Sequence, residues 1–484
     1  MSRPNRRDFF EQSLFAAAAA ASVTVGGEGD RLLAQSPVGQ GPNDTIHHAI
    51  IGCRIRGKAH ADEFGRIPGV KVNYVCDPDQ ELADRLADQV EKKQGSRPQI
   101  VKDMRVIFDD PAIHTVSIAA PNHWHALAAI WAMQSGKDVY VEKPVCHNVA
   151  EGRRMVQVAR KTGLICQGGT QNRSSGPLAE AAEFIRDGKL GDISLARTVI
   201  YGQRGSIGGP GKCEIPPQVD FNLWLGPGTD EQPTRSQLHY DWHWVWDTGN
   251  GELGNNNIHM IDICRWLLGL EGLGDSVFSV GGRMGYEDAG QTPNTQIVAH
   301  RFGPKTIIQE VRGLKTEPFV KPAKSGYVIY GSQGIIADAT LFTPEGELVR
   351  KFDRPGVNHF ANFIDAVRSR RVEDLRAEIL EGHQSTGLCH VGNISYRLGE
   401  PLSVPEIEAR LAGPEIDPAV RETFAGMVDH LRENGVDPER TPLTLGPTLA
   451  IDAARERFVD SPDADALLSR TYRKPFVVPA ENEI

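Results

Sequence analysis

Short apolar segments alternate with amphipathic helical segments from Thr45 to about Gln171, and this alternation is the feature that most restricts the fold. Apolar strands are predicted at residues 48–51, 70–76, 115–120, 138–141 and 164–167, with helices at 80–93, 125–135 and 149–162. Short strands separated by helices of about 10 to 15 residues predict right-handed β-α-β units and a parallel sheet. We therefore expect a doubly wound α/β domain, typical of nucleotide binding, over residues 45–170.

After Gln171 the pattern changes to longer segments in which polar and apolar residues alternate. Strands are predicted at 193–201, 277–283, 295–302, 307–312 and 326–330, with helices at 177–187, 359–371 and 376–397. This alternation predicts a second α/β domain, residues 171–400, with an open and mainly antiparallel sheet that has one face covered. We expect residues 401–484, with a helix near 418–434, to form a C-terminal extension that packs on this core.

The N-terminal segment has the features of an export signal. The pair Arg6-Arg7 precedes an apolar, alanine-rich run from Leu14 to Val25. A twin arginine before a modest apolar run is typical of a Tat signal, and the run is short for a membrane span. We therefore expect a Tat-type leader at residues 1–36, the Tat export machinery as a partner, and a periplasmic protein. The alternative is a chance Arg-Arg pair before an alanine-rich helix.

Charge and cysteine usage restrict the partners. The chain has 53 Lys and Arg residues against 63 Asp and Glu residues, a net charge of −10. Nucleic-acid-binding proteins carry basic fields that neutralise phosphates, so we expect no nucleic-acid partner. The seven cysteines are scattered and show neither metal-ligand spacing nor a disulfide framework, which predicts reduced, buried thiols.

The turn after the first predicted strand has an incomplete dinucleotide-binding fingerprint. It begins at Gly52 and reaches Gly57, but Arg54 replaces the middle glycine of G-x-G-x-x-G. A side chain there either displaces the phosphates slightly or contributes a guanidinium to them. Asp77, at the end of the second strand, is placed to accept hydrogen bonds from the adenosine ribose and to repel a 2′-phosphate, which favours NAD over NADP. Asp77 also suits a helix N-cap.

Polar clusters follow two later strands. Pro121-Asn122-His123-Trp124-His125 follows the strand at 115–120, and Glu142-Lys143-Pro144 follows the strand at 138–141. Because parallel strands end at one edge of the sheet, both clusters should converge on one crevice with Gly52 and Asp77. This convergence weakens the alternative, in which Lys143 belongs to a surface turn closed by a proline.

A third cluster lies in the second domain, where a glycine- and asparagine-rich run leads to His259 and Asp262. The apolar spacing after Asn255 predicts a helix that places His259 and Asp262 on one face. A histidine oriented by a carboxylate is a suitable general base, although it could also be a satisfied histidine on a buried helix. A metal site from His239, His243, His259 and Asp262 is the diffuse alternative, and we expect no metal.

Three tryptophans precede this run. On a strand, Trp242, Trp244 and Trp246 would share one face. Such a row could stack on a sugar ring, but it is more often packing.

In combination these residues resemble the Gfo/Idh/MocA oxidoreductase family over roughly residues 45–400. The resemblance rests on the glycine turn, Asp77, residues 121–125, Glu142-Lys143-Pro144 and the run to His259 and Asp262. It implies a Rossmann domain that binds NAD or NADP, followed by a substrate domain. If the second sheet has one exposed face, a homo-oligomer, a dimer or tetramer, is the expected assembly.

The resemblance also implies hydride transfer between a nicotinamide and a hydroxyl-bearing carbon of a sugar, polyol or glycoside. By position, Lys143 would hydrogen-bond the reacting hydroxyl, and His259 would take or relay its proton. The candidate substrate-binding residues are Asp262, Asn255, Trp246 and His125. The candidate cofactor-binding residues are Gly52, Arg54, Ile55, Gly57, Asp77, Pro121, Asn122, His125, Glu142 and Lys143.

Asn255 departs from the family pattern, because inositol-dehydrogenase-like members carry an aspartate there. An amide can neither act as a base nor hold a negative charge. The proton relay is therefore expected to run through Lys143 and His259 alone, or the chemistry differs from simple dehydrogenation. We expect a tightly held cofactor, because free nicotinamide cofactor is scarce outside the cytoplasm. The alternatives are an NAD-dependent redox glycosidase and a non-catalytic carbohydrate-binding protein on the same fold.

Overall fold

The computed structural model describes residues 45–317 and 325–484. The predicted leader, residues 1–36, lies outside them. Among the described residues, no helix combines the length and the apolar character that crossing a membrane requires.

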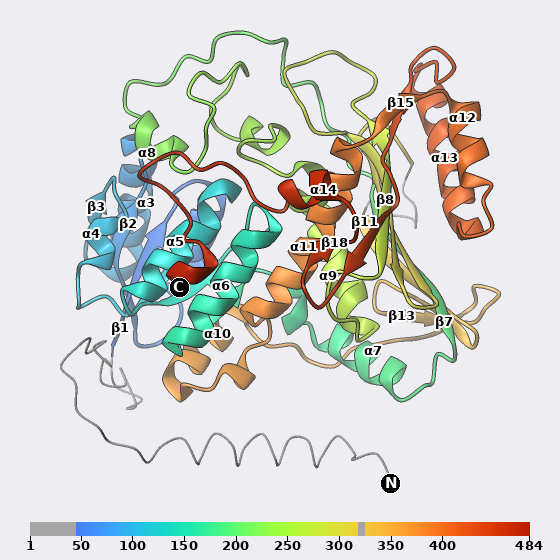
Figure 1. The fold of residues 1–484 in the computed structure, drawn as a ribbon. Helices are drawn as coiled ribbons and strands as arrows, with labels where there is room; N and C mark the ends of the chain where they lie inside the picture. Colours follow the sequence, from blue (N-terminus) through green and yellow to red (C-terminus); the bar gives the residue numbers. More distant parts are fainter. Residues whose placement is uncertain (1–44, 318–324) are drawn as a thin grey trace. The chain divides into compact units, whose positions relative to one another are not determined.

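The N-terminal domain is built on a six-stranded parallel sheet (Figure 1). Its strands are β1 (Ile46–Ile51), β2 (Val70–Cys76), β3 (Gln99–Val101), β4 (Thr115–Ile118), β5 (Asp138–Val141) and β6 (Cys166–Gly168). The order is β3-β2-β1-β4-β5-β6. β2 and β3 are added on one side of β1, and β4, β5 and β6 are added on the other side, so the strand order reverses between β1 and β4. This switch point opens a crevice at the carboxyl ends of the strands, as predicted from the sequence.

Helices cover both faces of this sheet. They are α2 (Ile55–Phe64), α3 (Gln80–Gln94), α4 (Arg105–Phe108), α5 (Asn122–Gln134) and α6 (Val149–Thr162). β4 and β5 are buried along their whole length, as central strands of a doubly covered sheet must be. The N-cap of α3 is Asp79, whose carboxylate accepts the N–H groups of Glu81 and Leu82. Asp77 is therefore not the cap of this helix.

The C-terminal domain contains a larger sheet in the order β14-β13-β12-β11-β7-β10-β9-β8-β16-β15. Its strands are β7 (Ile193–Ile200), β8 (Ser276–Gly282), β9 (Thr295–Phe302), β10 (Lys305–Arg312), β11 (Ser325–Gly331), β12 (Gly334–Ala337), β13 (Thr340–Phe342), β14 (Leu348–Lys351), β15 (Glu400–Leu402) and β16 (Leu443–Leu445), with β17 (Leu449–Asp452) and β18 (Arg457–Phe458) at one side. Only β7 and β10 pair in parallel along that order. The predicted α/β fold with an open, mainly antiparallel second sheet is confirmed.

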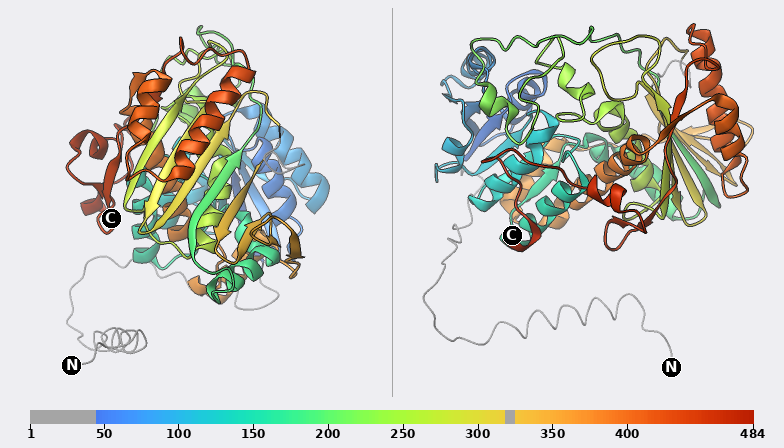
Figure 2. Two further views of the ribbon diagram at one scale, coloured as in Figure 1. Left: turned by 90° about the vertical axis from the view of Figure 1, so that its right-hand side faces the viewer. Right: turned by 45° about the horizontal axis from the view of Figure 1, so that its top comes forward.

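Both faces of the second sheet carry helices. α7 (Gly176–Arg186), α9 (Ile258–Leu267) and α11 (Ile379–Arg397) share a core with one face, whereas α12 (Val404–Leu411) and α13 (Pro418–Glu433) lie across β8, β9 and β10 on the other (Figure 2). On that second face, Phe424 and Met427 pack against Ile297 and Ile308. The region after residue 400 thus contributes strands to the sheet and also covers part of a face that the sequence predicted to be open.

Two irregular segments complete the crevice. Residues 201–252, which join β7 to the turn before α9, contain only α8 (Phe221–Leu225) and a 3-10 turn at Asp241–Trp244. The three tryptophans at 242, 244 and 246 therefore do not lie on a strand, and they do not form one aromatic face. α10 (His359–Ser369) packs on the N-terminal domain, with Phe360 stacked on Tyr140.

Candidate active site

The glycine turn between β1 and α2 retains the two glycines whose geometry matters here. Gly52 has φ = +90°, and a Cβ on it would lie 2.5 Å from the Ala119 carbonyl carbon. A Cβ on Gly57 would lie 1.9 Å from the Gly52 oxygen, so this glycine allows α2 to pack on the turn. Arg54, in contrast, is exposed, so its side chain fits here, and its guanidinium lies 5.8 Å from the centre of the Tyr240 ring. No side chain caps α2, which leaves its N-terminus at Ile55 available to phosphate.

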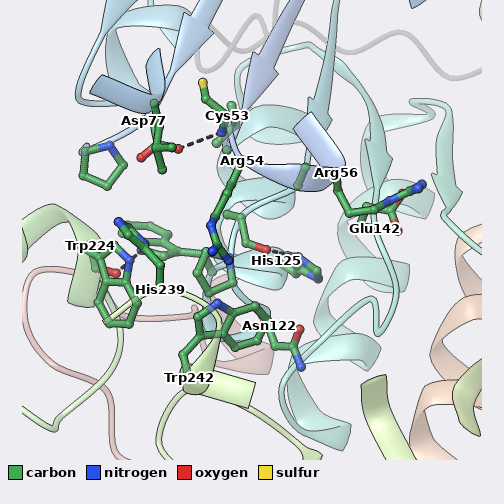
Figure 3. A pocket seen from close by; sticks show the side chains of 18 of the residues that line it. Cys53, Arg54, Arg56, Asp77, Asn122, His125, Glu142, Trp224, His239 and Trp242 are labelled. Carbon is green, nitrogen blue, oxygen red and sulfur yellow. Dashed lines mark hydrogen bonds and ion pairs between the residues drawn. The ribbon is translucent and has the colours of Figure 1, made fainter. Parts of the chain in front are cut away.

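Asp77 connects the end of β2 to this turn. Its carboxylate accepts the Cys53 N–H at 2.7 Å (Figure 3). It also accepts the Asp79 N–H at 2.9 Å. Burial raises the pKa of Asp77 to about 6, although the two backbone hydrogen bonds oppose that shift. A carboxylate at this position can still accept hydroxyl donors with its remaining lone pairs.

One cavity brings together most of the predicted site residues. Those that line it are Gly52, Arg54, Ile55, Asp77, Pro121, Asn122, His125, Glu142, Lys143 and Asn255. Gly57 lies behind Gly52, whereas His259, Asp262 and Trp246 do not line the cavity. The opposite wall comes from residues 201–252 and includes Trp224, His239 and Trp242 (Figure 3). Tyr240 and His243 also line it. The sequence did not indicate Trp224 or Tyr240, and it named the other three only as alternatives, the histidines for a metal site and Trp242 for stacking on a sugar.

Glu142 is fixed by three neighbours and does not present a free carboxylate. Its Oε1 accepts from Arg56 at 2.5 Å, from His60 at 3.0 Å and from Gln171 at 3.1 Å. Burial would raise the pKa of Glu142, but His60 and Arg56 hold it well below its usual value. Arg56 and His60 are four residues apart on α2, a spacing that places them on one helix face. Glu142 therefore anchors the strand end that carries Lys143.

Lys143 extends from this anchored strand end into the cavity. Its ammonium donates to the backbone oxygen of Asn255. Burial, together with Arg56 and Arg204, lowers the pKa of Lys143, whereas Glu142 and Glu252 act in the opposite direction. An ammonium with a lowered pKa gives up its proton more readily than an ordinary lysine, which suits proton exchange with a substrate oxygen.

His259 lies on the first turn of α9, near Lys143. Burial and the charge of Lys143 lower its pKa to about 3, so the imidazole is neutral near pH 7. Its Nδ1 has no hydrogen-bond partner among the residues that the structure describes. The predicted pairing with Asp262 is not observed: Asp262 accepts from Arg173 Nε at 2.9 and 3.0 Å and from the Ser385 hydroxyl at 2.6 Å. The buried arginine needs that carboxylate as its counter-ion.

His125 and Asn122 position the walls of the cavity. The two ring nitrogens of His125 lie 2.6 Å from the Pro144 oxygen and 2.7 Å from the Ala120 oxygen. This ring therefore links the ends of two neighbouring strands. Asn122 donates to Asn250 Oδ1 at 3.0 Å and so joins the two domains.

Trp246 and the cysteines lie apart from this chemistry. Trp246 lines a different hollow with Asn250 and Arg470, and the Arg397 guanidinium lies 5.4 Å from its ring. All seven cysteines are free and buried. Within residues 45–317 and 325–484, no three His, Cys, Asp or Glu side chains are grouped so that they could hold a metal ion.

The outer wall is fastened to the N-terminal domain. Trp124 donates to the Leu223 oxygen at 3.0 Å, the Asp220 N–H donates to the Pro78 oxygen at 2.9 Å, and His239 contacts Asp79 at 2.9 Å. The C-terminal tail adds a second fastening, because Arg473 donates to the Gly226 oxygen at 3.0 Å and to Asn222 at 2.7 Å. We call this wall, residues 201–252, the covering segment.

The sheet order, the glycine turn, the acidic end of β2 and the lysine at the end of β5 define a class of protein, the dinucleotide-binding α/β oxidoreductases. Two family models match the chain. "Oxidoreductase family, NAD-binding Rossmann fold" matches residues 46–170, and "Oxidoreductase family, C-terminal alpha/beta domain" matches residues 209–422. The chain belongs to the Gfo/Idh/MocA oxidoreductase family, which agrees with the resemblance found in the sequence.

Individual relatives match shorter parts. A glycosyl hydrolase family 109 protein of Shewanella baltica is 32% identical over 127 residues, 25% of this chain and 28% of that protein. A levoglucosan dehydrogenase of Pseudarthrobacter phenanthrenivorans is 26% identical over 231 residues, 46% of this chain and 51% of the relative. These matches thus span about half or less of the relatives' length.

Solved structures share the fold. The WlbA dehydrogenase from Bordetella pertussis, solved with NADH and UDP-GlcNAcA, has a TM-score of 0.53 and 20% identity and covers 71% of this chain and 94% of its own. A levoglucosan dehydrogenase complex with NADH and levoglucosan has a TM-score of 0.52 and 21% identity over 72% of this chain and 95% of its own.

Proposed function

We propose that this protein is an NAD-dependent oxidoreductase that acts on a hydroxyl-bearing carbon of a sugar or polyol. The observation that carries the proposal is the placement of Lys143, which reaches from the end of β5 into the same cavity as the glycine turn and Asp77. The levoglucosan dehydrogenase and WlbA names support a carbohydrate as the class of substrate.

The residues present fit a nicotinamide dinucleotide, which would accept or supply the hydride when bound. A Cβ at Gly52 would clash with the Ala119 backbone and one at Gly57 with the Gly52 oxygen, so these glycines allow the tight turn and the close packing that bring the N-terminus of α2 to the cavity. The uncapped N-terminus of α2 would bind the phosphates, and Asp77 would accept the ribose hydroxyls. Because a buried carboxylate repels a 2′-phosphate, the site favours NAD over NADP.

Lys143 would donate a hydrogen bond to the hydroxyl or carbonyl oxygen at the reacting carbon. In oxidation of an alcohol, the proton leaves that oxygen as the hydride leaves the carbon, and a neutral neighbour must take it. His259 is neutral and near Lys143, and so it is the candidate relay. The general acid-base contribution of such a group is about 10²- to 10⁴-fold in rate.

We further propose that the cofactor is held tightly. The covering segment lines the outer side of the cavity. Hydrogen bonds fasten it to Pro78 after β2, to Trp124 on α5 and to Arg473 in the tail. Denatured, purified protein should release a dinucleotide with nicotinamide absorbance. Protein that neither carries nor binds NAD or NADP would contradict both the tight binding and the proposed oxidoreductase function.

A redox glycosidase is the second candidate, and the family 109 relatives favour it. In that chemistry, oxidation at a ring carbon acidifies the neighbouring C–H, a base removes that proton, the aglycone leaves by elimination, and the hydride returns after water adds. Release of aglycone without accumulation of reduced cofactor would single it out. A non-catalytic carbohydrate binder would show sugar binding but no turnover on a broad panel of sugars and polyols.

Export and assembly belong to the same proposal. Arg6-Arg7 and the following apolar run support export by the Tat machinery to the periplasm. Replacing both arginines with lysine should retain the protein in the cytoplasm, and unchanged export would contradict the proposal.

We expect a dimer or tetramer, measured as mass in solution, because α12 and α13 cover only part of the outer sheet face.

A further inference from the structure

Glu252 is a buried carboxylate beside the candidate active site that the sequence did not point to. It is 3% exposed and precedes a π-helical turn, Leu253–Asn257, that leads into α9. Arg204, in the covering segment, donates to both of its oxygens, at 3.2 Å from Nε and 3.0 Å from Nη2. A carboxylate that bonded only this arginine would be a structural ion pair, so its other partners decide its role.

Those other partners are two amides of the π-helical turn. Asn255 donates from Nδ2 to Glu252 at 3.3 Å, and Asn256 donates from its own Nδ2. Asn255 also lines the cavity, and its backbone oxygen accepts the Lys143 ammonium. Glu252 therefore fixes the π-helical turn, and the Asn255 backbone oxygen of that turn binds the Lys143 ammonium.

We propose that Glu252 is a positioning residue of this active site, which supplies the negative charge that Asn255 lacks and orients the Asn255 amide toward a hydroxyl-bearing substrate. The inference rests on the proposed function. Because the Asn255 NH₂ group bonds Glu252, its Oδ1 is the group that it offers to the cavity. An amide oxygen accepts a hydrogen bond from a hydroxyl but not from a carboxylate. The wall beside Lys143 thus favours a neutral polyol or sugar over an acidic one.

The charges around Lys143 give this role a measurable signature. The charged and titratable groups that act on Lys143 or are shifted by it are Glu142, Glu252, Arg56, Arg204, His125, His243 and His259. Burial and the two arginines lower the pKa of Lys143, and the two glutamates raise it. Removing the charge of Glu252 takes away one raising contribution, so the ammonium should lose its proton at a lower pH.

Competitive acetylation of the full chain, read by mass spectrometry, measures the titration of Lys143 without any need for turnover. In Glu252→Gln the midpoint should fall by on the order of one pH unit. Glu456→Gln is the matched control, because Glu456 is also a largely buried carboxylate, paired with Arg153 and His383, and does not line the cavity. An unchanged Lys143 midpoint in folded Glu252→Gln would overturn the proposal even if the protein proved inactive.

Glu252→Asp keeps the charge beside Arg204 but shortens the reach to the two amides, and it covers the case in which the glutamine variant does not fold. We expect kcat on a polyol to fall about tenfold, with dinucleotide affinity and the Lys143 midpoint retained. Unchanged kcat and KM in this variant would contradict the positioning role. If neither the parent protein nor the variants bound a dinucleotide, that result would count against the proposed function instead.

Discussion

At the scale of single residues, two side chains predicted to act on substrate have other partners in the structure. Asp262 is the counter-ion of Arg173, and His125 links the Ala120 and Pro144 carbonyls. The place of His125 at the cavity was predictable from the strand end that precedes it, and the place of Asp262 on α9 was predictable from the helix spacing. Their partners were not, since Arg173 and Ser385 are distant in the sequence and no local pattern connects them to Asp262.

The Asp262–Arg173 pair predicts a stability effect. Both side chains are almost fully buried, so Asp262→Asn leaves the guanidinium without its main counter-ion. We expect a loss of about 3 kcal/mol in the free energy of unfolding, measured by urea denaturation. Arg173→Met combined with Asp262→Asn should recover part of that loss. If Asp262→Asn unfolded at the parent's urea concentration, the buried pair would not have the role assigned here.

The pKa of Asp77 predicts a pH dependence for cofactor binding. This carboxylate is ionised above pH about 6, and ribose hydroxyls donate to the ionised form. Protonation at lower pH removes that acceptor, so NAD affinity should decrease by roughly tenfold as the pH falls about one unit below this pKa. Titration calorimetry should find this dependence in the parent protein and a flat profile in Asp77→Asn. Equal slopes in the two proteins would assign the dependence to another group.

At the scale of elements, the strands and helices of the first domain followed from periodicity, whereas the covering segment did not. β1, β2 and α3 repeat apolar residues at regular spacing, so local sequence indicates them. Residues 201–252 have no period, and their conformation depends on long-range contacts such as Trp124 with Leu223. The short strand β3 was also missed, because it has only two apolar residues: Gln99 is exposed, and Ile100 and Val101 are partly buried.

The fastening of the covering segment by the tail predicts a kinetic effect. Arg473→Met removes the hydrogen bonds to Gly226 and Asn222. Opening of the segment should then become easier, and the dissociation rate of NADH should rise about tenfold, a change of about 1.4 kcal/mol in the barrier. Stopped-flow fluorescence measures this rate. Arg440→Met is the control, because Arg440 is exposed and its one ion pair within the described part of the chain is with nearby Asp437. Similar NADH dissociation rates in the two variants would contradict a fastening role for Arg473.

At the scale of the whole molecule, the two-domain α/β class and the location of the crevice were predictable, because both follow from the order of strands along the chain. The sequence predicted that residues 401–484 pack on the core, but it did not indicate that β15 and β16 join the second sheet or that α12 and α13 lie on its outer face. Strand pairing between segments more than a hundred residues apart depends on tertiary packing. The cavity likewise needs both domains, since Lys143 and Asn255 belong to different ones.

The central claim is that Lys143 performs chemistry in a cavity that binds a dinucleotide. The most direct test measures reduction of NAD by absorbance on a panel of sugars and polyols, together with NAD affinity, in the parent protein and in Lys143→Met. We expect kcat to fall by about 10²- to 10⁴-fold while NAD affinity stays within about threefold. A Lys143→Met protein that turns over as fast as the parent would contradict the central claim.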